Sequence, residues 1–384
     1  MCSIDEINRK IDWQGVEKSR NELLITQTKF ILPSMCIPPN RLNILLDQAL
    51  QLQRQNCLYH NEDANECLLV DHSCQREKFP NHTTHLLEEH RDEVWFMAFS
   101  HDGTKLASAS RDARAIIWDV ENFKILYVLD DHKKAISYLS WSPDDSYLLT
   151  ASNDTTLKLW NTKTGQMIQT FSKHTDSVTS CVWHPSGSSF VSGSVEKNMY
   201  HWNINGEILF HWPGVRIMDL AMTSDGKKLI ACSEKRIRVF DFDDKSELYS
   251  LTEHEPITSV CLSKDDKFLL VNLSVSEIHL WNLKDRTVDK KYFGQKQGRF
   301  VIRSCLGGIE ENFVLSGSED YQVYVWHREL GTIIENLPGH SACVNCVAWN
   351  PKKTMFASAS DDQQIRIWGP GVNPYQKLGK EKLD

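Results

Sequence analysis

The chain lacks the features that would mark a membrane protein, a nucleic-acid binder or a catalyst. Its 384 residues contain no run of 18 apolar residues, so we expect no membrane-spanning helix. The first residues are acidic and no apolar core follows them, so we expect no secretion signal. The net charge of −8, from 43 basic and 51 acidic residues, disfavours general binding to nucleic acid. No phosphate-binding loop or pair of catalytic carboxylates stands out, so we expect neither a cofactor nor an active site.

Cysteine is present, but its spacing predicts neither disulfides nor a metal site. The 11 cysteines are scattered, and in a chain with no expected secretion signal they indicate reduced thiols. Cys343 and Cys346 form a lone CxxC pair with no second pair beside it. Cys67, His72 and Cys74 offer three metal-binding side chains but lack a fourth ligand. We therefore expect no bound metal.

The chain does contain a regular series of aromatic residues, each at the end of a strand-like run. Successive members lie 42, 42, 38, 41, 45 and 42 residues apart. They are Trp118, Trp160, Trp202, Phe240, Trp281, Trp326 and Trp368. A period of roughly 40–45 residues containing four short strands is typical of WD40 blades. The seven marks predict an all-β fold, a closed seven-bladed WD40 β-propeller, preceded by a short α-helical segment.

Helical spacing is confined to the start of the chain, where a leucine-rich run over 42–52 follows two prolines. We expect a helical segment at 1–60, a polar linker at 61–82, the propeller at 83–370 and a polar tail at 371–384.

One repeat element occurs an extra time ahead of the first blade. Residues 84–90 resemble the segments that form the outer strands of later blades, whereas no outer strand follows Trp368. We expect residues 83–88 to supply the missing outer strand of the last blade, which would close the ring and remove an exposed sheet edge.

Four polar and aromatic residue types recur at fixed offsets. A His stands 28, a Ser or Thr 10 and an Asp 6 residues before the Trp. The complete sets are His90, Ser108, Asp112 and Trp118; His132, Thr150, Asp154 and Trp160; and His340, Ser358, Asp362 and Trp368. A catalytic triad is the alternative, but threefold repetition and a serine within a strand pattern disfavour it. We interpret each set as a buried hydrogen-bond relay from Asp through His and Ser or Thr to the indole N–H.

The relay pattern weakens along the chain. Blade three has Glu196 in place of the Asp. Blade four ends in Phe240 and has no relay histidine, blade five retains His254 and Trp281, and blade six lacks the histidine. We expect fewer relays in blades four to six.

Several stretches resemble the WD-repeat subunit family of the GID/CTLH ubiquitin ligase. The most specific is the run 45–61, LLDQALQLQRQNCLYHN, ahead of the propeller. Others lie at 79–80, 90–95, 103–107, 141–145, 214–216, 236–238, 316–320, 323–327, 344–351 and 366–370. The resemblance covers residues 5–370. Family members carry a LisH motif and a full CTLH helical region before the run 45–61, whereas this chain starts near the end of that region, which leaves self-association open.

The resemblance implies a non-catalytic scaffold that recruits substrates or adaptors for a multi-subunit RING-type E3 ligase. The implied partners are RING and LisH-CTLH subunits and substrate or adaptor proteins, with no nucleic acid and no membrane insertion. The implied location is the cytoplasm and nucleus. A general WD40 signalling scaffold of the G-protein-β-like kind is the alternative, and a propeller hydrolase would need a metal or nucleophile constellation that is not evident.

Partners of propellers usually bind the face formed by the loops that enter each blade and the turns ahead of the relay acid. An exposed Trp or Arg on that face is a typical interface anchor. The candidate positions are Glu93, Trp95, Arg111, Asn153, Arg216, Arg303, Glu319 and Asp361. We expect Trp95 to be the main anchor, unless it packs under a loop, and Arg216 and Arg303 to offer positive charge to acidic peptides, unless they are simply solvated.

Overall fold

A computed structural model describes residues 20–22, 24–25, 40–61 and 71–371. The chain forms two compact units, which divide between Arg54 and Gln55. The N-terminal unit contains most of helix α3 (Arg41–Asn56), which has no buried residue. The helix covers the leucine-rich run, while most of the remaining helix predicted within 1–60 lies outside the described residues. No helix in the described ranges has the length and apolar character needed to span a bilayer.

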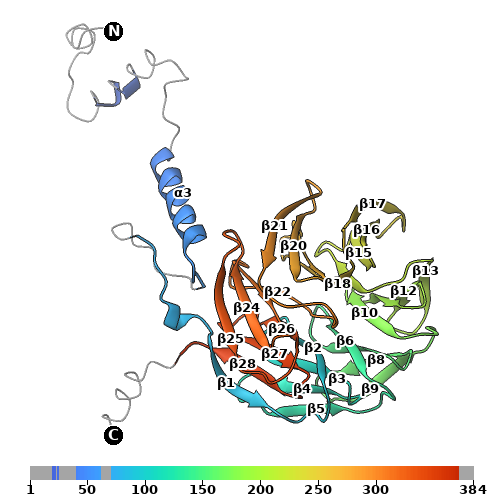
Figure 1. Ribbon diagram of the computed structural model, residues 1–384. Coiled ribbons are helices and arrows are strands. Elements are labelled where there is room, and N and C mark those ends of the chain that lie inside the picture. The colour runs from blue at the N-terminus through green and yellow to red at the C-terminus, as the bar shows by residue number, and fades with distance from the viewer. Residues whose placement is uncertain (1–19, 23, 26–39, 62–70, 372–384) are drawn as a thin grey trace. The chain divides into compact units, whose positions relative to one another are not determined.

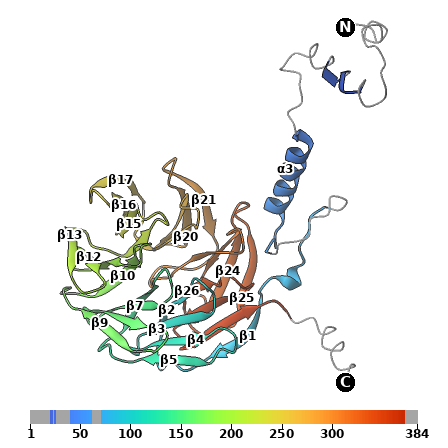
Figure 2. The ribbon, with the colours of Figure 1, turned by 180° about the vertical axis from the view of Figure 1, so that it is seen from behind.

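The second unit is a β-propeller, which confirms the predicted fold class. Its described residues form seven four-stranded antiparallel sheets, which follow one another around the ring in chain order (Figures 1 and 2). Six of the sheets are built from consecutive strands. We number the blades from the sheet β2–β5 as blade one to the sheet containing β26–β28 as blade seven.

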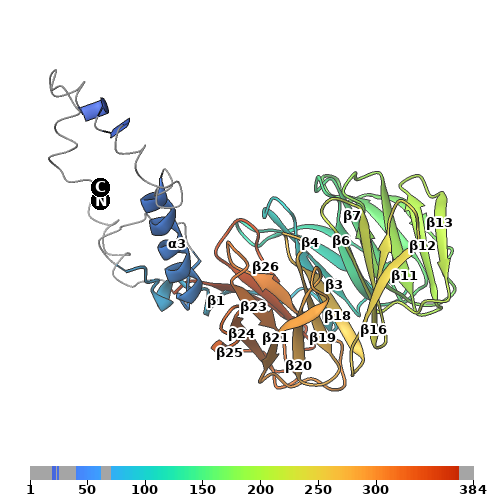
Figure 3. The ribbon, with the colours of Figure 1, turned by 90° about the horizontal axis from the view of Figure 1, so that it is seen from above.

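The strand bounds of the first three blades repeat with little variation. Blade one contains β2 (Val94–Phe99), β3 (Lys105–Ser110), β4 (Ala115–Asp119) and β5 (Ile125–Leu129). Blade two contains β6 (Ile136–Trp141), β7 (Tyr147–Ser152), β8 (Leu157–Asn161) and β9 (Met167–Phe171). Blade three contains β10 (Val178–Trp183), β11 (Ser189–Ser194), β12 (Asn198–Asn203) and β13 (Ile208–Pro213), and Figure 3 shows β11 to β13 side by side.

The next three blades are less regular and include the shortest inner strands. Blade four contains β14 (Asp219–Met222), β15 (Lys228–Ser233), β16 (Arg236–Asp241) and β17 (Glu247–Thr252). Blade five contains β18 (Ile257–Leu262), β19 (Phe268–Leu273), β20 (Glu277–Asn282) and β21 (Thr287–Phe293). Blade six contains β22 (Cys305–Gly307), β23 (Phe313–Ser316), β24 (Gln322–His327) and β25 (Ile333–Pro338).

Blade seven joins the two ends of the propeller. It contains β26 (Val344–Trp349), β27 (Phe356–Ser360), β28 (Ile365–Gly369) and, from the front of the chain, β1 (His82–Leu87). β1 pairs antiparallel with β28, from His82 opposite Gly369 to Leu87 opposite Ile365. Figure 1 shows this junction as blue β1 beside red β28. The expected clasp is therefore present, and it covers the edge that β28 would otherwise expose.

The core lies between neighbouring blades. Ala107 and Ala109 of β3 share one buried cluster with Ile136, Leu139 and Trp141 of blade two. The small side chains on one blade leave room for the tryptophans and branched side chains of the next, so the sheets stack closely. Each blade therefore depends on its neighbours for burial.

The turn between β2 and β3 shows how polar residues fix the strand connections. Gly103 has a φ of +70°, and a Cβ placed there would lie 2.6 Å from Oδ1 of Asn350. The carboxylate of Asp102 accepts hydrogen bonds from the amide and the hydroxyl of Thr104, at 2.9 and 2.8 Å. The left-handed backbone favours glycine, and the close approach of Asn350 from blade seven leaves no room for a Cβ.

Candidate functional site

The predicted relay residues of blades one, two and seven are brought together in the order that their spacing suggests. In blade one, Nδ1 of His90 lies 3.0 Å from Oδ2 of Asp112 and its Nε2 lies 2.8 Å from Oγ of Ser108. The indole N–H of Trp118 donates to the same Oγ at 2.9 Å. This chain of bonds is complete when Nδ1 donates to the carboxylate and Nε2 accepts the serine proton.

The other two complete sets have the same geometry. The distances from His132 to Asp154 and Thr150 are 2.8 and 2.7 Å, and Trp160 donates to the Thr150 hydroxyl at 3.0 Å. For the third set, the corresponding distances are as follows: His340 to Asp362 2.9 Å, His340 to Ser358 2.7 Å and Trp368 to Ser358 2.8 Å.

Blade three shows that glutamate serves in the same position. Glu196 lies 2.6 Å from Nδ1 of His174, whose Nε2 lies 2.8 Å from Ser192 Oγ, and Trp202 donates to that oxygen at 2.8 Å. The longer carboxylate also accepts the amide of Thr175 at 2.9 Å. The blade therefore holds a full relay.

Blades four to six lack this relay, and in blades five and six the indole N–H donates to other groups. In blade five His254 is half exposed, and the buried Glu253 accepts the indole N–H of Trp281 and contacts Nδ1 of His279 at 2.9 Å. The expectation that His254 is the retained relay histidine is wrong, because the neighbouring carboxylate reaches the indole directly. In blade six, Trp326 donates to the carbonyl of Phe293 rather than to Ser316.

The relay carboxylates are held in their charged form. Burial by itself would raise the pKa of Asp112, but hydrogen bonds from His90 and from the Arg91 amide outweigh it and lower that pKa to about 2. The pKa of Asp362 is also about 2, because bonds from His340 and the Ser341 amide outweigh burial. A carboxylate fixed in this way, with a serine that already accepts an indole N–H, is a structural link and not a nucleophile-activating set.

A cavity of about 620 Å³ opens at the face where the inner strands begin. Because β2 and β3 are antiparallel, the start of β2 lies beside the turn that follows β3, and the same holds for β26 and β27. We call this cavity the mouth. The mouth brings together five of the eight predicted partner-binding residues: Glu93, Trp95, Arg111, Arg303 and Asp361.

Polar contacts hold the mouth residues in position. The indole N–H of Trp95 donates to Oε2 of Glu93 at 2.8 Å, and Nη1 of Arg111 contacts Oε1 of the same carboxylate at 2.8 Å. Asn345 donates to Oδ1 of Asp361 at 2.6 Å and to the carbonyl of Val94 at 3.0 Å. Trp95 is half buried, so part of its side chain remains accessible to a partner.

One lip of the mouth is apolar and exposed. Phe300 and Val301, in the loop between β21 and β22, are 45% and 44% exposed. Oε1 of Glu319 accepts the amides of Gly298, Arg299 and Phe300 at 2.9, 2.7 and 2.9 Å and so fixes this loop. Glu319 therefore acts beneath the lip rather than lining the cavity.

Arg303 neither offers a free positive charge nor is solvated, so both expectations for this residue are wrong. It is 9% exposed, and its Nη1 donates to Oδ2 of Asp219 across the central channel at 2.9 Å. The guanidinium lies over the rings of Phe96 and Tyr138, with ring centroids at 5.1 and 4.7 Å. Charge pairing and cation–π contact make Arg303 the floor of the mouth.

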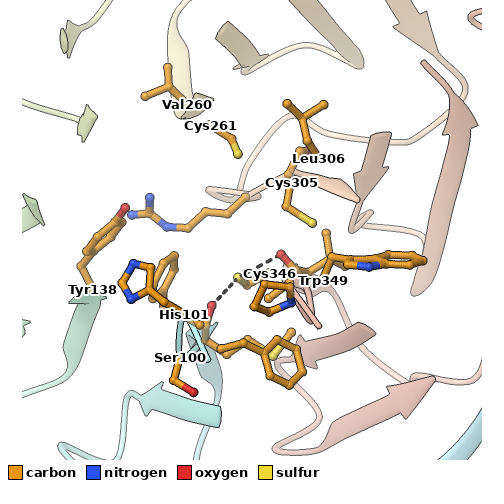
Figure 4. A pocket seen from close by; sticks show the side chains of 18 of the residues that line it. Ser100, His101, Tyr138, Val260, Cys261, Cys305, Leu306, Cys346 and Trp349 are labelled. Atoms are coloured by element: carbon orange, nitrogen blue, oxygen red, sulfur yellow. Dashed lines mark hydrogen bonds between the residues drawn. The ribbon is translucent and has the colours of Figure 1, made fainter. Parts of the chain in front are cut away.

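Arg303 also lines a second cavity of about 570 Å³ at the other end of the channel, shown in Figure 4. Cys261, Cys305 and Cys346 face this space. Burial raises the pKa of both Cys261 and Cys346 to about 11. Their sulfurs are therefore protonated at neutral pH, which disfavours a role as nucleophiles or metal ligands.

Two predicted residues lie apart from the mouth. Arg216 is exposed and lines a separate cationic hollow with Lys197, Lys235, Arg236 and Arg238, where its guanidinium lies 3.9 Å from the carboxylate of Glu234. Asn153 is half buried in the turn between β7 and β8 and does not line the mouth. Phe300 and Val301 line the mouth but were not predicted, because no repeat offset marks the loop between β21 and β22.

Comparison with known proteins agrees with the repeat pattern. The family model described as "WD domain, G-beta repeat" matches residues 81–119, 123–161, 165–203 and 331–369. These matches contain the four complete relays, including the Glu196 variant, and leave residues 204–330 unmatched, which include all of blades four and five and three of the four strands of blade six.

Several relatives match most of the chain. A protein named GID complex subunit 7 from Schizosaccharomyces pombe is 41% identical over 376 residues, which are 96% of this chain and 74% of that protein. A WD repeat-containing protein 26 homolog from Arabidopsis thaliana is 40% identical, over 91% of this chain and 61% of its own length. The corresponding homolog from Drosophila melanogaster is 37% identical, over 97% and 62%. The chain thus spans about three fifths to three quarters of these relatives, and it belongs to the WD-repeat protein family that includes GID complex subunit 7 and the WD repeat-containing protein 26 homologs.

Proposed function

We propose that this chain is a non-catalytic scaffold of a multi-subunit RING-type E3 ubiquitin ligase and recruits substrates or adaptors at the mouth. The observation that carries the proposal is the 41% identity, over 96% of this chain, to a protein named as a GID complex subunit. The propeller supplies a rigid platform for that role, because each blade is packed between two others and the ring is closed by β1.

The mouth has the properties of a recognition site for a short segment of a partner protein. Glu93 holds both Trp95 and Arg111, so these side chains are ordered before a partner arrives. Ordered aromatic and Arg side chains lose little entropy on binding and are common interface anchors. Phe300 and Val301 add apolar surface that a partner would remove from water. A volume of about 620 Å³ accommodates a few side chains of a peptide segment.

The chemistry of the described residues supports a binding role rather than catalysis. Each relay serine accepts a bond from a tryptophan, and the thiols at the far end of the channel have a raised pKa. The proposal places partner docking on the propeller and ligase assembly, through RING and LisH-CTLH proteins, on residues 1–60. It also includes action in the cytoplasm and nucleus, as the family resemblance implies, and fractionation of cells would test this location.

The test is co-purification of the tagged full chain from cell lysate, with proteins identified by mass spectrometry. The variants are Trp95→Ala, Phe300→Ala and a deletion of residues 1–60. Phe210→Ala is the matched control, because Phe210 is 37% exposed on the outer strand β13, away from the mouth. We expect the full chain to recover RING and LisH-CTLH proteins, the deletion to lose them, and the two mouth variants to keep them while losing substrate or adaptor proteins.

Two outcomes would contradict the proposal. Failure of the full chain to recover any RING or LisH-CTLH protein would favour a signalling scaffold that acts outside a ligase. Recovery of the same partners by Trp95→Ala, Phe300→Ala and Phe210→Ala would move the docking surface away from the mouth.

A further inference from the structure

Two short segments just ahead of the propeller bring four metal-binding side chains together. Cys57 directly follows helix α3, and the amide of His60 donates to its carbonyl at 3.3 Å, which closes a turn over Cys57–His60. The second segment carries His72 and Cys74. Burial alternates along it: His72 and Cys74 are half buried, whereas Asp71, Ser73 and Gln75 are exposed. Residues two apart in such a segment point to the same side, so His72 and Cys74 both face the turn.

The ligand atoms of these side chains converge on one small volume. The ligand atoms of Cys57, His72 and Cys74 all lie within 4.8 Å of one another. Nδ1 of His60 lies 2.9 Å from Nε2 of His72 and 3.6 Å from Sγ of Cys74. Sγ of Cys74 lies 3.3 Å from Nε2 of His72. His60 is 5% exposed, so the cluster has a buried side.

These separations resemble the edges of a tetrahedral metal site. Zinc bonds of about 2.0–2.1 Å to nitrogen and about 2.3 Å to sulfur give N–S edges of about 3.5 Å and N–N edges of about 3.3 Å. The observed N–S distances of 3.3 and 3.6 Å lie on either side of that value, and the N–N distance of 2.9 Å needs to lengthen by a few tenths of an ångström. The geometry points to a structural zinc site formed by Cys57, His60, His72 and Cys74.

The donor set suits Zn²⁺ better than the harder cations. Two thiolates and two neutral imidazoles are soft or borderline ligands, whereas Mg²⁺ and Ca²⁺ prefer oxygen. Two thiolates also cancel the double positive charge of the ion, so the loaded site is neutral in a half-buried place. Four protein ligands complete the tetrahedron, which is the arrangement of structural zinc sites and not of catalytic ones.

Both segments contact the propeller, so the ion would connect two segments that are already held in place. The hydroxyl of Tyr59 donates to Oε1 of Glu335 at 3.2 Å, and Nη2 of Arg76 donates to Oε2 of that carboxylate at 2.8 Å. Phe79 is fully buried, with its ring centroid 5.0 Å from that of Phe313. The zinc would therefore stabilise the position of the segment that leads into β1, by bonding it to the Cys57–His60 turn.

The sequence spacing alone conceals this site. The CxxC pair and the group of Cys67, His72 and Cys74 are the more regular patterns, but Cys343 and Cys346 lie in blade seven and Cys67 lies outside the described residues. Eleven residues separate His60 from His72, so only the fold shows that the Cys57–His60 turn meets the second segment.

The first test is the metal content of the purified full chain, measured by inductively coupled plasma mass spectrometry. We expect about one zinc ion per chain, and at least about a tenfold lower content in Cys57→Ser, Cys74→Ser and His72→Ala. Cys261→Ser, a half-buried cysteine in the channel, is the matched control and should retain the zinc. Co²⁺ added to metal-depleted wild type should give the visible absorption of a tetrahedral thiolate site, and the ligand variants should not.

The second test needs no variant and so holds even if a substitution prevents folding. Alkylation of the wild-type chain, mapped by mass spectrometry, should modify Cys57 and Cys74 only after a chelator is added, with Cys261 and Cys343 unaffected by the chelator. Chain that contains no zinc and takes up no Co²⁺ would overturn the inference. So would a disulfide between Cys57 and Cys74, or alkylation of both that is indifferent to the chelator.

Discussion

Every blade is a four-stranded sheet, but two groups of blades stabilise their sheets by different polar contacts. Blades one, two, three and seven form the first group, and blades four, five and six form the second. In the first group, a Ser or Thr hydroxyl accepts the indole N–H and passes the bond on to a His and a carboxylate. In the second group, blade four ends in Phe240, blade five uses Glu253, and blade six uses the carbonyl of Phe293. The sheet therefore requires that the buried donor be satisfied, and does not require one particular partner.

The irregular blades supply contacts that hold the floor and the lip of the mouth in place. Asp219 begins β14 of blade four, and its carboxylate accepts bonds from Ser180, from the Val260 amide and from Arg303. Glu319 of blade six holds the lip loop. Departures from a repeat are expected where a chain has a task other than folding, and here they coincide with the channel and its mouth.

The largest effect should come from breaking the blade that both ends of the propeller share. Deleting residues 83–88 removes most of β1, including the buried side chain of Leu87, which is 6% exposed, and leaves the edge of β28 unpaired. We expect loss of the cooperative unfolding transition or a large fall in its midpoint, measured by circular dichroism during heating. Leu86→Ala, at a side chain that is 41% exposed, is the control and should change the midpoint little. An unchanged transition in the deletion would refute the role of the clasp.

A smaller effect should distinguish the two groups of blades when the buried serine at the same repeat position is replaced in each. Ser108 in blade one and Ser316 in blade six are both fully buried, but only Ser108 joins a histidine to an indole. Ser108→Ala leaves two buried polar groups unpaired and should lower the free energy of unfolding by about 1–3 kcal/mol. Ser316→Ala removes one bond to the Gly317 carbonyl and should cost about 1 kcal/mol or less. Urea denaturation of both variants measures the difference, and equal losses would contradict the relay interpretation.

Much of the difference between the two groups of blades could be predicted from the sequence. The contacts that could not be predicted were missed for physical reasons. The offsets of 28, 10 and 6 residues placed His90, Ser108 and Asp112 correctly around Trp118, because a β-meander converts fixed spacing into fixed position. The same rule fails for His254, since one residue earlier a longer carboxylate reaches the indole. It also fails for Arg303, whose partner Asp219 lies 84 residues away across the channel. Contacts across the ring axis have no period, and sequence spacing carries no signal for them.

The smallest expected effect is a dependence of stability on pH that the relay aspartates produce. The pKa of Asp112 is about 2 in the folded chain and about 3.9 in an unfolded one. A lowered carboxyl pKa stabilises the fold above the unfolded value, and this stabilisation disappears as the pH falls towards 2. Between pH 6 and pH 3, Asp112 should account for roughly 1 kcal/mol of lost stability, and Asp112→Asn should lose that much less over the same range.

The serine variant provides the control for this measurement. Ser108→Ala keeps the contact between Asp112 and Nδ1 of His90 and should therefore keep the wild-type pH dependence, although its stability is lower at every pH. Urea denaturation of wild type, Asp112→Asn and Ser108→Ala at several pH values compares the slopes directly. Equal slopes in wild type and Asp112→Asn would mean that the histidine contact does not hold this carboxylate in its charged form, and the relay would then be a packing arrangement of neutral groups.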